Sequence, residues 1–178
     1  MRKKKIMTAV WAILLGLLYF SIFGFSGQTG EESGSLSFSV SEKCAEIVNA
    51  ISGKHWTEQT LHSMALYFEH PIRKLAHFGE YAVMGILVSR MLRPWIVKDP
   101  DEKKKKRKWC FLTVLWVFLS AAADEIHQFF VPGRYCSFTD AMIDTAGGFC
   151  GMLFCIVLEK IFRRKKPERN FPVIQQRK

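Results

Sequence analysis

Charged residues in this sequence are gathered into blocks, and long apolar runs separate the blocks. The net charge of +10 would also suit a soluble protein that binds nucleic acid. Here, however, lysine and arginine flank the apolar runs instead of being scattered along the chain. Basic residues at the ends of apolar runs are typical of proteins that cross a membrane. The pattern therefore predicts an all-α membrane protein and argues against a nucleic-acid partner.

Four apolar runs approach the length of about 20 residues that spans a bilayer as a helix. The first follows the basic start MRKKK, but it is longer than the apolar core of a signal peptide and no convincing cleavage site follows it. We therefore expect it to be retained. The sequence predicts one membrane domain, residues 1–178, folded as a four-transmembrane-helix bundle. The predicted spans are residues 6–25, 72–92, 109–130 and 140–162.

Lysine and arginine also predict the orientation of the bundle. If both termini lie inside, the start of the chain, the connector 93–108 and the tail 163–178 carry most of the 26 basic residues. Inner segments of membrane proteins are enriched in these residues, so we expect both termini to be cytoplasmic. The same residues would attract anionic membrane lipids. The basic residues left on the outer side are Lys43, Lys54, Arg73, Lys74 and Arg134.

Residues 26–70 are predicted to form an outer segment between the first two spans. The segment starts rich in serine and glycine, which indicates a loop followed by short helices. A helical spacing of apolar residues predicts an amphipathic helix over Thr57–Glu69, lying in the membrane interface or packed on neighbouring helices. Proline suits the first turn of a helix, so Pro71 is expected to begin the second span.

The five cysteines form no CxxC pair and have no metal-ligand spacing. Three of them lie in apolar segments, where a free thiol acts as a small apolar side chain. Cys44 and Cys136 are both expected outside and could form a disulfide.

The predicted topology brings ionisable side chains, and the amide of one glutamine, from three spans to the same outer level of the bundle. They are Lys74, His77 and Glu80 in the second span, Asp124, Glu125 and Gln128 at the end of the third, Arg134 in the following loop, and Asp140 and Asp144 at the start of the fourth. Ionisable residues at membrane depth are candidates for function by default. A buried ion-pair network that only fixes the helix packing would use the same residue types.

Asp124 is expected to need a partner. It lies about 22 Å along a helix from Trp109, short of the ~30 Å thickness of the hydrocarbon core. An unpaired carboxylate at that depth costs several kcal/mol, so pairing with Lys74 or Arg134, or protonation, is expected. In the last span, Gly147 and Gly151 form a small-xxx-small pair that lets another helix approach closely.

At these residues the chain resembles the VanZ-like family of small bacterial membrane proteins, whose founding member is associated with teicoplanin resistance. The resemblance rests on RKLAHFGEY (73–81), DEIHQFFVPGR (124–134) and the D-x-x-x-D-x-x-G pattern that begins at Asp140. The serine-rich segment FSGQTGEESGSLS is also similar to an outer loop of that family. The family's characteristic positions fall on Lys74, His77, Glu80, Asp124, Glu125, Gln128, Arg134, Asp140 and Gly147.

The resemblance implies a protein of the bacterial cytoplasmic membrane and cell envelope, linked to lowered susceptibility to glycopeptide and lipoglycopeptide antibiotics. It brings no defined reaction with it. One hypothesis is a binding protein whose outer polar pocket holds a lipid-linked envelope precursor, another amphipathic ligand or a lipoglycopeptide. Lys74, His77 and Arg134 would donate hydrogen bonds to a phosphate or carboxylate, and Glu80, Gln128, Asp140 and Asp144 would complete the pocket.

The alternative is an intramembrane hydrolase or transferase that acts on a lipid-linked cell-wall substrate. Asp124 or Glu125 would be the general base, His77 the acid, and Arg134 would stabilise an anion. A metal-dependent version would use His77, Glu80, Asp124 and Asp140, but the sequence contains no HExxH motif, and we predict neither a metal nor a cofactor. A transporter is disfavoured because four spans without an internal repeat are too few.

Overall fold

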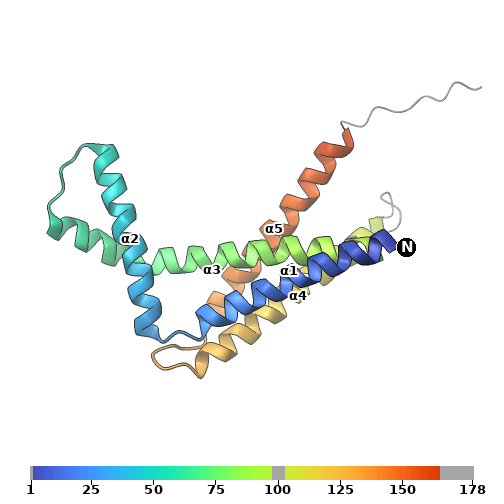
Figure 1. Ribbon diagram of the computed structural model, residues 1–178, viewed down its shortest axis with the longest axis horizontal. Coiled ribbons are helices and arrows are strands. Elements are labelled where there is room, and N and C mark those ends of the chain that lie inside the picture. Colours follow the sequence, from blue (N-terminus) through green and yellow to red (C-terminus); the bar gives the residue numbers. More distant parts are fainter. Residues whose placement is uncertain (1, 98–102, 165–178) are drawn as a thin grey trace, which may run out of the picture.

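The computed structural model describes residues 2–97 and 103–164, which form five α-helices and no β-strand (Figure 1). The helices are α1 (Arg2–Ser26), α2 (Gly30–Ser52), α3 (Glu58–Ile96), α4 (Lys103–Phe129) and α5 (Phe138–Arg164). The chain is thus all-helical, as predicted. Residues 98–102 of the predicted connector and 165–178 of the predicted tail lie outside the described residues.

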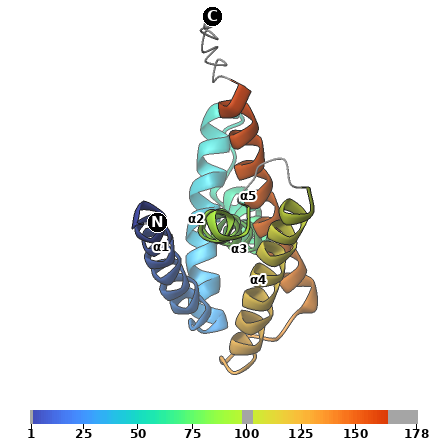
Figure 2. The same cartoon turned by 90° about the vertical axis from the view of Figure 1, so that its right-hand side faces the viewer.

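Three of the described helices, α1, α4 and α5, are long and apolar enough to cross a membrane. The longest helix, α3, is not among them, and its apolar stretch is interrupted by Glu80 and Arg90. This helix occupies the centre of the fold, where it contacts each of the other four helices (Figure 2). Tyr81, Met84 and Val88 are accordingly almost completely buried. The least apolar of the predicted spans is therefore the one that other helices enclose.

The four long helices run in two opposite directions. Helices α1 and α4 run the same way, α3 and α5 run the other way, and the N-terminus lies beside the last turns of α3 (Figure 1). The contacts that define these directions are Tyr19–Ser120 and Ser26–Asp124 between α1 and α4, and Lys74–Asp140 and Arg93–Glu159 between α3 and α5. The ends of α1 and α4 and the start of α5 consequently lie at one end of the bundle.

The prediction of a serine-rich loop after the first span was wrong, because residues 30–52 form one helix. Thr29 caps it: its hydroxyl accepts from the Glu32 backbone, and the Glu32 carboxylate accepts from the Thr29 backbone, which lowers the pKa of Glu32. The serines also have a role in packing. Ser33, Ser37 and Ser41 recur every four residues on a buried face, and Ser41 Oγ donates to the Ala65 carbonyl of α3. Small side chains let the two helices approach closely.

Pro71 does not begin a helix, contrary to prediction, because α3 runs unbroken for 39 residues with Pro71 inside it. The residues predicted as an amphipathic helix, Thr57–Glu69, form the N-cap and first third of α3, where the Thr57 side chain accepts from the Thr60 backbone. A proline removes one backbone hydrogen bond from a helix. Two interactions hold the helix together around Pro71. Ala65, before the proline, is buried against α2, and the ion pair between Glu69 and Arg73 joins the turn before the proline to the turn after it.

Glycines set the distance between α3 and α5, as the small-xxx-small pair predicted. A Cβ atom on Gly147 would lie 2.3 Å from the Phe78 carbonyl oxygen, and one on Gly151 would lie 1.9 Å from that of Ala82. A Cβ on Gly85 of α3 would likewise lie 2.0 Å from the Gly148 carbonyl oxygen. These neighbours are backbone atoms and cannot rotate away. The two helices therefore touch backbone to backbone over about two turns.

Gly151→Ala is expected to force α3 and α5 apart and to destabilise the protein by about 1–3 kcal/mol, the usual cost of overpacking. The measurement is the thermal unfolding midpoint of the purified protein in detergent. Gly16→Ala is the matched control, because a Cβ at Gly16 of α1 meets nothing within 4 Å. Equal midpoints for the two variants would contradict the close contact.

Candidate functional site

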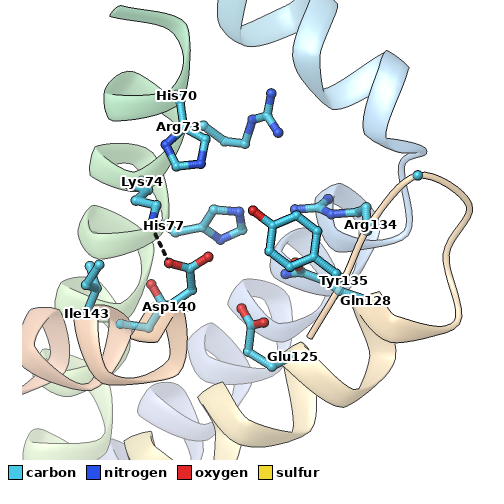
Figure 3. A pocket seen from close by; sticks show the side chains of 12 residues that line it. His70, Arg73, Lys74, His77, Glu125, Gln128, Arg134, Tyr135, Asp140 and Ile143 are labelled. Atoms are coloured by element: carbon cyan, nitrogen blue, oxygen red, sulfur yellow. Dashed lines mark hydrogen bonds and ion pairs between the residues drawn. The ribbon is translucent and has the colours of Figure 1, made fainter. Parts of the chain in front are cut away.

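A polar cavity of about 240 Å³ opens at the end of the bundle where α4 ends and α5 begins (Figure 3). Its walls come from α3, α4, α5 and the loop that joins α4 to α5. The lining residues are His70, Arg73, Lys74, His77, Glu125, Gln128, Gly133, Arg134, Tyr135, Asp140, Ile143 and Asp144. Side chains of both charges face the same space.

Most of the site residues predicted from sequence line this cavity. They are Lys74, His77, Glu125, Gln128, Arg134, Asp140 and Asp144. The other two lie next to it. Asp124 is buried behind Gln128, and Glu80 lines an adjoining groove, with its carboxylate 3.7 Å from His77 Nδ1. The cluster expected from three separate spans thus gathers at one place.

Lys74 and Asp140 form an ion pair that bridges α3 and α5, with 2.5 Å between Nζ and Oδ1. Both side chains remain about one-third exposed to the cavity. The expectation for Asp124 was pairing with Lys74 or Arg134, or protonation, and the pairing part of it was wrong. The close packing of α3 on α5 places Lys74 opposite the first turn of α5, and Asp124 lies on a different helix.

Asp124 is held by neutral donors instead of a cation. It is 1% exposed, and its Oδ2 accepts from Ser26 Oγ at 2.8 Å and from Gln128 Nε2 at 2.9 Å. Gln128 Nε2 also lies 3.2 Å from Ser26 Oγ, so the three side chains form a closed triangle between α1 and α4. The second oxygen, Oδ1, is buried and has no partner within the described ranges. Asp124 therefore supports the cavity from behind and does not line it.

Glu125 connects α4 to the start of α5. Its Oε2 accepts from the Ser137 backbone at 2.7 Å, and Ser137 Oγ in turn accepts from the Asp140 backbone at 3.2 Å. The bond to Ser137 uses one carboxylate oxygen of Glu125. The first turn of α5, which carries the partner of Lys74, is in this way fixed relative to α4.

Arg134 reaches the cavity from the α4–α5 loop, which turns at Gly133 with a φ of 75°. The loop is pressed against the start of α2: the Gly30 backbone donates to the Pro132 carbonyl at 3.0 Å, and a Cβ on Gly30 would meet Gly133 at 2.3 Å. Arg134 Nη1 donates to the Phe25 carbonyl at 3.4 Å, and within residues 2–97 and 103–164 the guanidinium makes no ion pair. Burial, with the nearby positive charge of Arg73, lowers the pKa of Arg134, but an arginine keeps its charge at neutral pH.

A family model described as VanZ/LLP1 matches residues 11–159 of the chain. The chain belongs to the VanZ-like family. No curated protein and no solved structure matches it. Family membership and the three apolar helices make this a membrane protein linked to antibiotic resistance.

Five residues that line the cavity of this VanZ-like protein were not among the predicted site residues: His70, Arg73, Gly133, Tyr135 and Ile143. His70 lies four residues before Lys74 and seven before His77, which is one face of a helix. His70 shares this face only because α3 continues through Pro71. The prediction that a helix begins at Pro71 therefore left His70 out of the site. Tyr135 follows Arg134 in a loop, where no periodicity indicates which way a side chain points (Figure 3).

No three His, Cys, Asp or Glu side chains of the described residues are arranged to hold a metal ion. Within the cavity, Asp140 is paired with Lys74, and one carboxylate oxygen of Glu125 accepts from the Ser137 backbone. Cys44 and Cys136 are both exposed and free, so the disulfide that their predicted location allowed is not formed.

Ser26→Ala is expected to lower stability by about 1–3 kcal/mol, because it removes a donor from a buried carboxylate that already has one oxygen unpaired. Thermal unfolding in detergent measures the change. Ser39→Ala is the control, since Ser39 is exposed and its hydroxyl bonds only to the Ser35 carbonyl of its own helix. A midpoint for Ser26→Ala that equals the control would show that Asp124 does not depend on this donor.

Proposed function

We propose that this VanZ-like protein crosses the bacterial cytoplasmic membrane four times, with both termini in the cytoplasm and the cavity facing outward. There it would bind the anionic headgroup of a lipid-linked or amphipathic ligand of the cell envelope. Binding of such a ligand would lower susceptibility to glycopeptide or lipoglycopeptide antibiotics.

The topology is supported by the distribution of charge and by the helix directions. The basic residues that begin α1 and α4 and those that end α5 lie at the opposite end of the bundle from the cavity. Basic segments favour the cytoplasmic side. Residues 72–92 of α3 would be the remaining span, second along the chain, and their charged side chains are tolerable there because α1, α4 and α5 pack around this helix.

The observation that carries the proposed ligand is the guanidinium of Arg134, which lines the cavity without an ion-pair partner among the described residues. Arg73 and Lys74 are paired with carboxylates, whereas the guanidinium of Arg134 has only a long bond to a backbone carbonyl. A guanidinium without a carboxylate partner has several N–H donors left for a phosphate or carboxylate. The carboxylates of Glu125 and Asp144 on the other walls would accept from hydroxyl or amide groups of the same ligand.

A specific observation also favours an enzyme as the second candidate. Glu125 faces the cavity and has a hydrogen bond to only one of its carboxylate oxygens, so the other could take a proton from a substrate or water. His77 lies in the same cavity as a group that could return it. The substrate would again be a lipid-linked cell-wall compound.

Arg134→Ala is expected to weaken binding of hexadecyl phosphate to the purified protein in a nonionic detergent by about 10–100-fold, the cost of losing hydrogen bonds to a charged group. Calorimetric titration measures it, with hexadecanol as the neutral ligand. Lys43→Ala removes the same charge from an exposed site outside the cavity and should leave binding unchanged. Equal loss in both variants would mean that only net charge matters.

The same assay separates the two candidate functions when it is combined with antibiotic susceptibility of expressing cells. Glu125→Gln keeps an oxygen that can accept from the Ser137 backbone but removes the base. A binding protein should retain both hexadecyl phosphate binding and its effect on susceptibility in this variant. An enzyme should retain binding and lose the effect.

The proposed orientation predicts that a membrane-impermeant maleimide labels Cys44 and Cys136 in intact cells, because both are exposed near the outer end of the bundle. A Cys44→Ser, Cys136→Ser double variant should not be labelled. Lys104→Cys in that background, at the exposed start of α4, should react only after the cells are permeabilised. Labelling of Lys104→Cys in intact cells would show that the protein has the opposite orientation in the membrane.

A further inference from the structure

A second hollow, of about 190 Å³, adjoins the polar cavity, and its surface is mainly apolar although polar side chains also border it. It is a groove between the end of α1, the first half of α2 and α3. Its apolar lining consists of Phe25, Leu36, Val40, Ile72 and Ala76. Phe25, Leu36 and Val40 are between 44% and 50% exposed, so no other part of the described chain fills the groove.

The groove and the cavity share two residues, Arg73 and His77. Arg73 is held at this junction from both sides: its Nε donates to Ser37 Oγ of α2 at 3.4 Å, and it pairs with Glu69 of α3. His77 lies one turn further along α3 and also borders both spaces. A molecule that fills both hollows would therefore pass between a guanidinium and an imidazole where its polar part joins its apolar part.

We propose that the groove holds the first part of the hydrocarbon chain of an anionic lipid whose headgroup lies in the polar cavity. This inference rests on the proposed function and specifies its ligand class: a lipid in which a phosphate or another anion is attached directly to a long chain. Arg73 and His77 contact the ligand at the junction of headgroup and chain, and Arg134 holds the headgroup.

The continuity of the two hollows favours a chain over a helix of another protein, because a chain attached to a headgroup in the cavity can run directly into the groove, which shares Arg73 and His77 with it. The groove has a volume of about 190 Å³. A methylene group is comparable in size to a water molecule, about 30 Å³, which gives room for about six of them. The polar end of the groove carries both charges, because Arg73 and His77 lie there beside Glu69 and Glu80, and an anionic headgroup would be held beyond it by Arg134.

The test uses a long-chain alkyl phosphate with a photoreactive diazirine within its first six carbons, added to the protein in phosphatidylcholine vesicles. Cross-links to groove residues such as Leu36 and Ile72 are expected, identified by mass spectrometry and competed away by unlabelled hexadecyl phosphate. Arg134→Ala should abolish these cross-links. Val40→Trp should abolish them as well by filling the groove, and Ile47→Trp, an equivalent change at an exposed position of α2 outside the groove, should not.

The outcomes separate this inference from the proposed function. Arg134-dependent binding of the phosphate with cross-links that fall outside the groove would overturn the inference and leave the headgroup site standing. Equal labelling of the groove by the neutral diazirine alcohol, unaffected by Arg134→Ala, would show that bulk lipid fills it, which also overturns the inference. Absence of any Arg134-dependent binding would overturn both.

Discussion

The backbone contact between α3 and α5 is the constraint on which the rest of the structure depends. Gly147 and Gly151 meet Phe78 and Ala82 at distances that leave no room for a methyl group. The candidate site lies just beyond this contact, where Lys74 and Asp140 come from the same two helices and form their ion pair. A wider separation would break that pair and open the cavity wall, so the glycines determine the geometry of charged residues they do not touch.

The central position of α3 explains how the bundle accommodates its polar groups. Charged side chains are costly wherever they face lipid. Helix α3 carries many of them and is enclosed by its neighbours, whereas the helices with the most apolar exposed surfaces surround it. Its charged residues also have partners close by: Arg73 pairs within α3, and Lys74 and Arg93 pair with α5. Membrane compatibility is a property of the assembled bundle and not of each helix alone.

The sequence predicted the helical class and the gathering of Lys74, His77, Glu125 and Asp140, because apolar runs and the positions of charged blocks fix which residues share a level. It did not predict the partners across helices. Whether Asp124 meets a cation or Ser26 depends on helix rotation, which hydropathy does not encode. The composition of the α2 segment was misleading, since serines at every fourth position signal packing as well as loops. Pro71 misled because tertiary contacts, absent from local propensity, keep α3 continuous.

The bond from the Gly30 backbone to the Pro132 carbonyl has a consequence for the position of Arg134. It fastens the turn after α1 to the loop that carries Arg134, and the tight fit of Gly30 against Gly133 leaves no slack between them. The loop cannot move away from the bundle unless the start of α2 moves with it. A shift of α2 would therefore move Arg134 with it, so the position of this guanidinium is coupled to a helix that does not line the cavity.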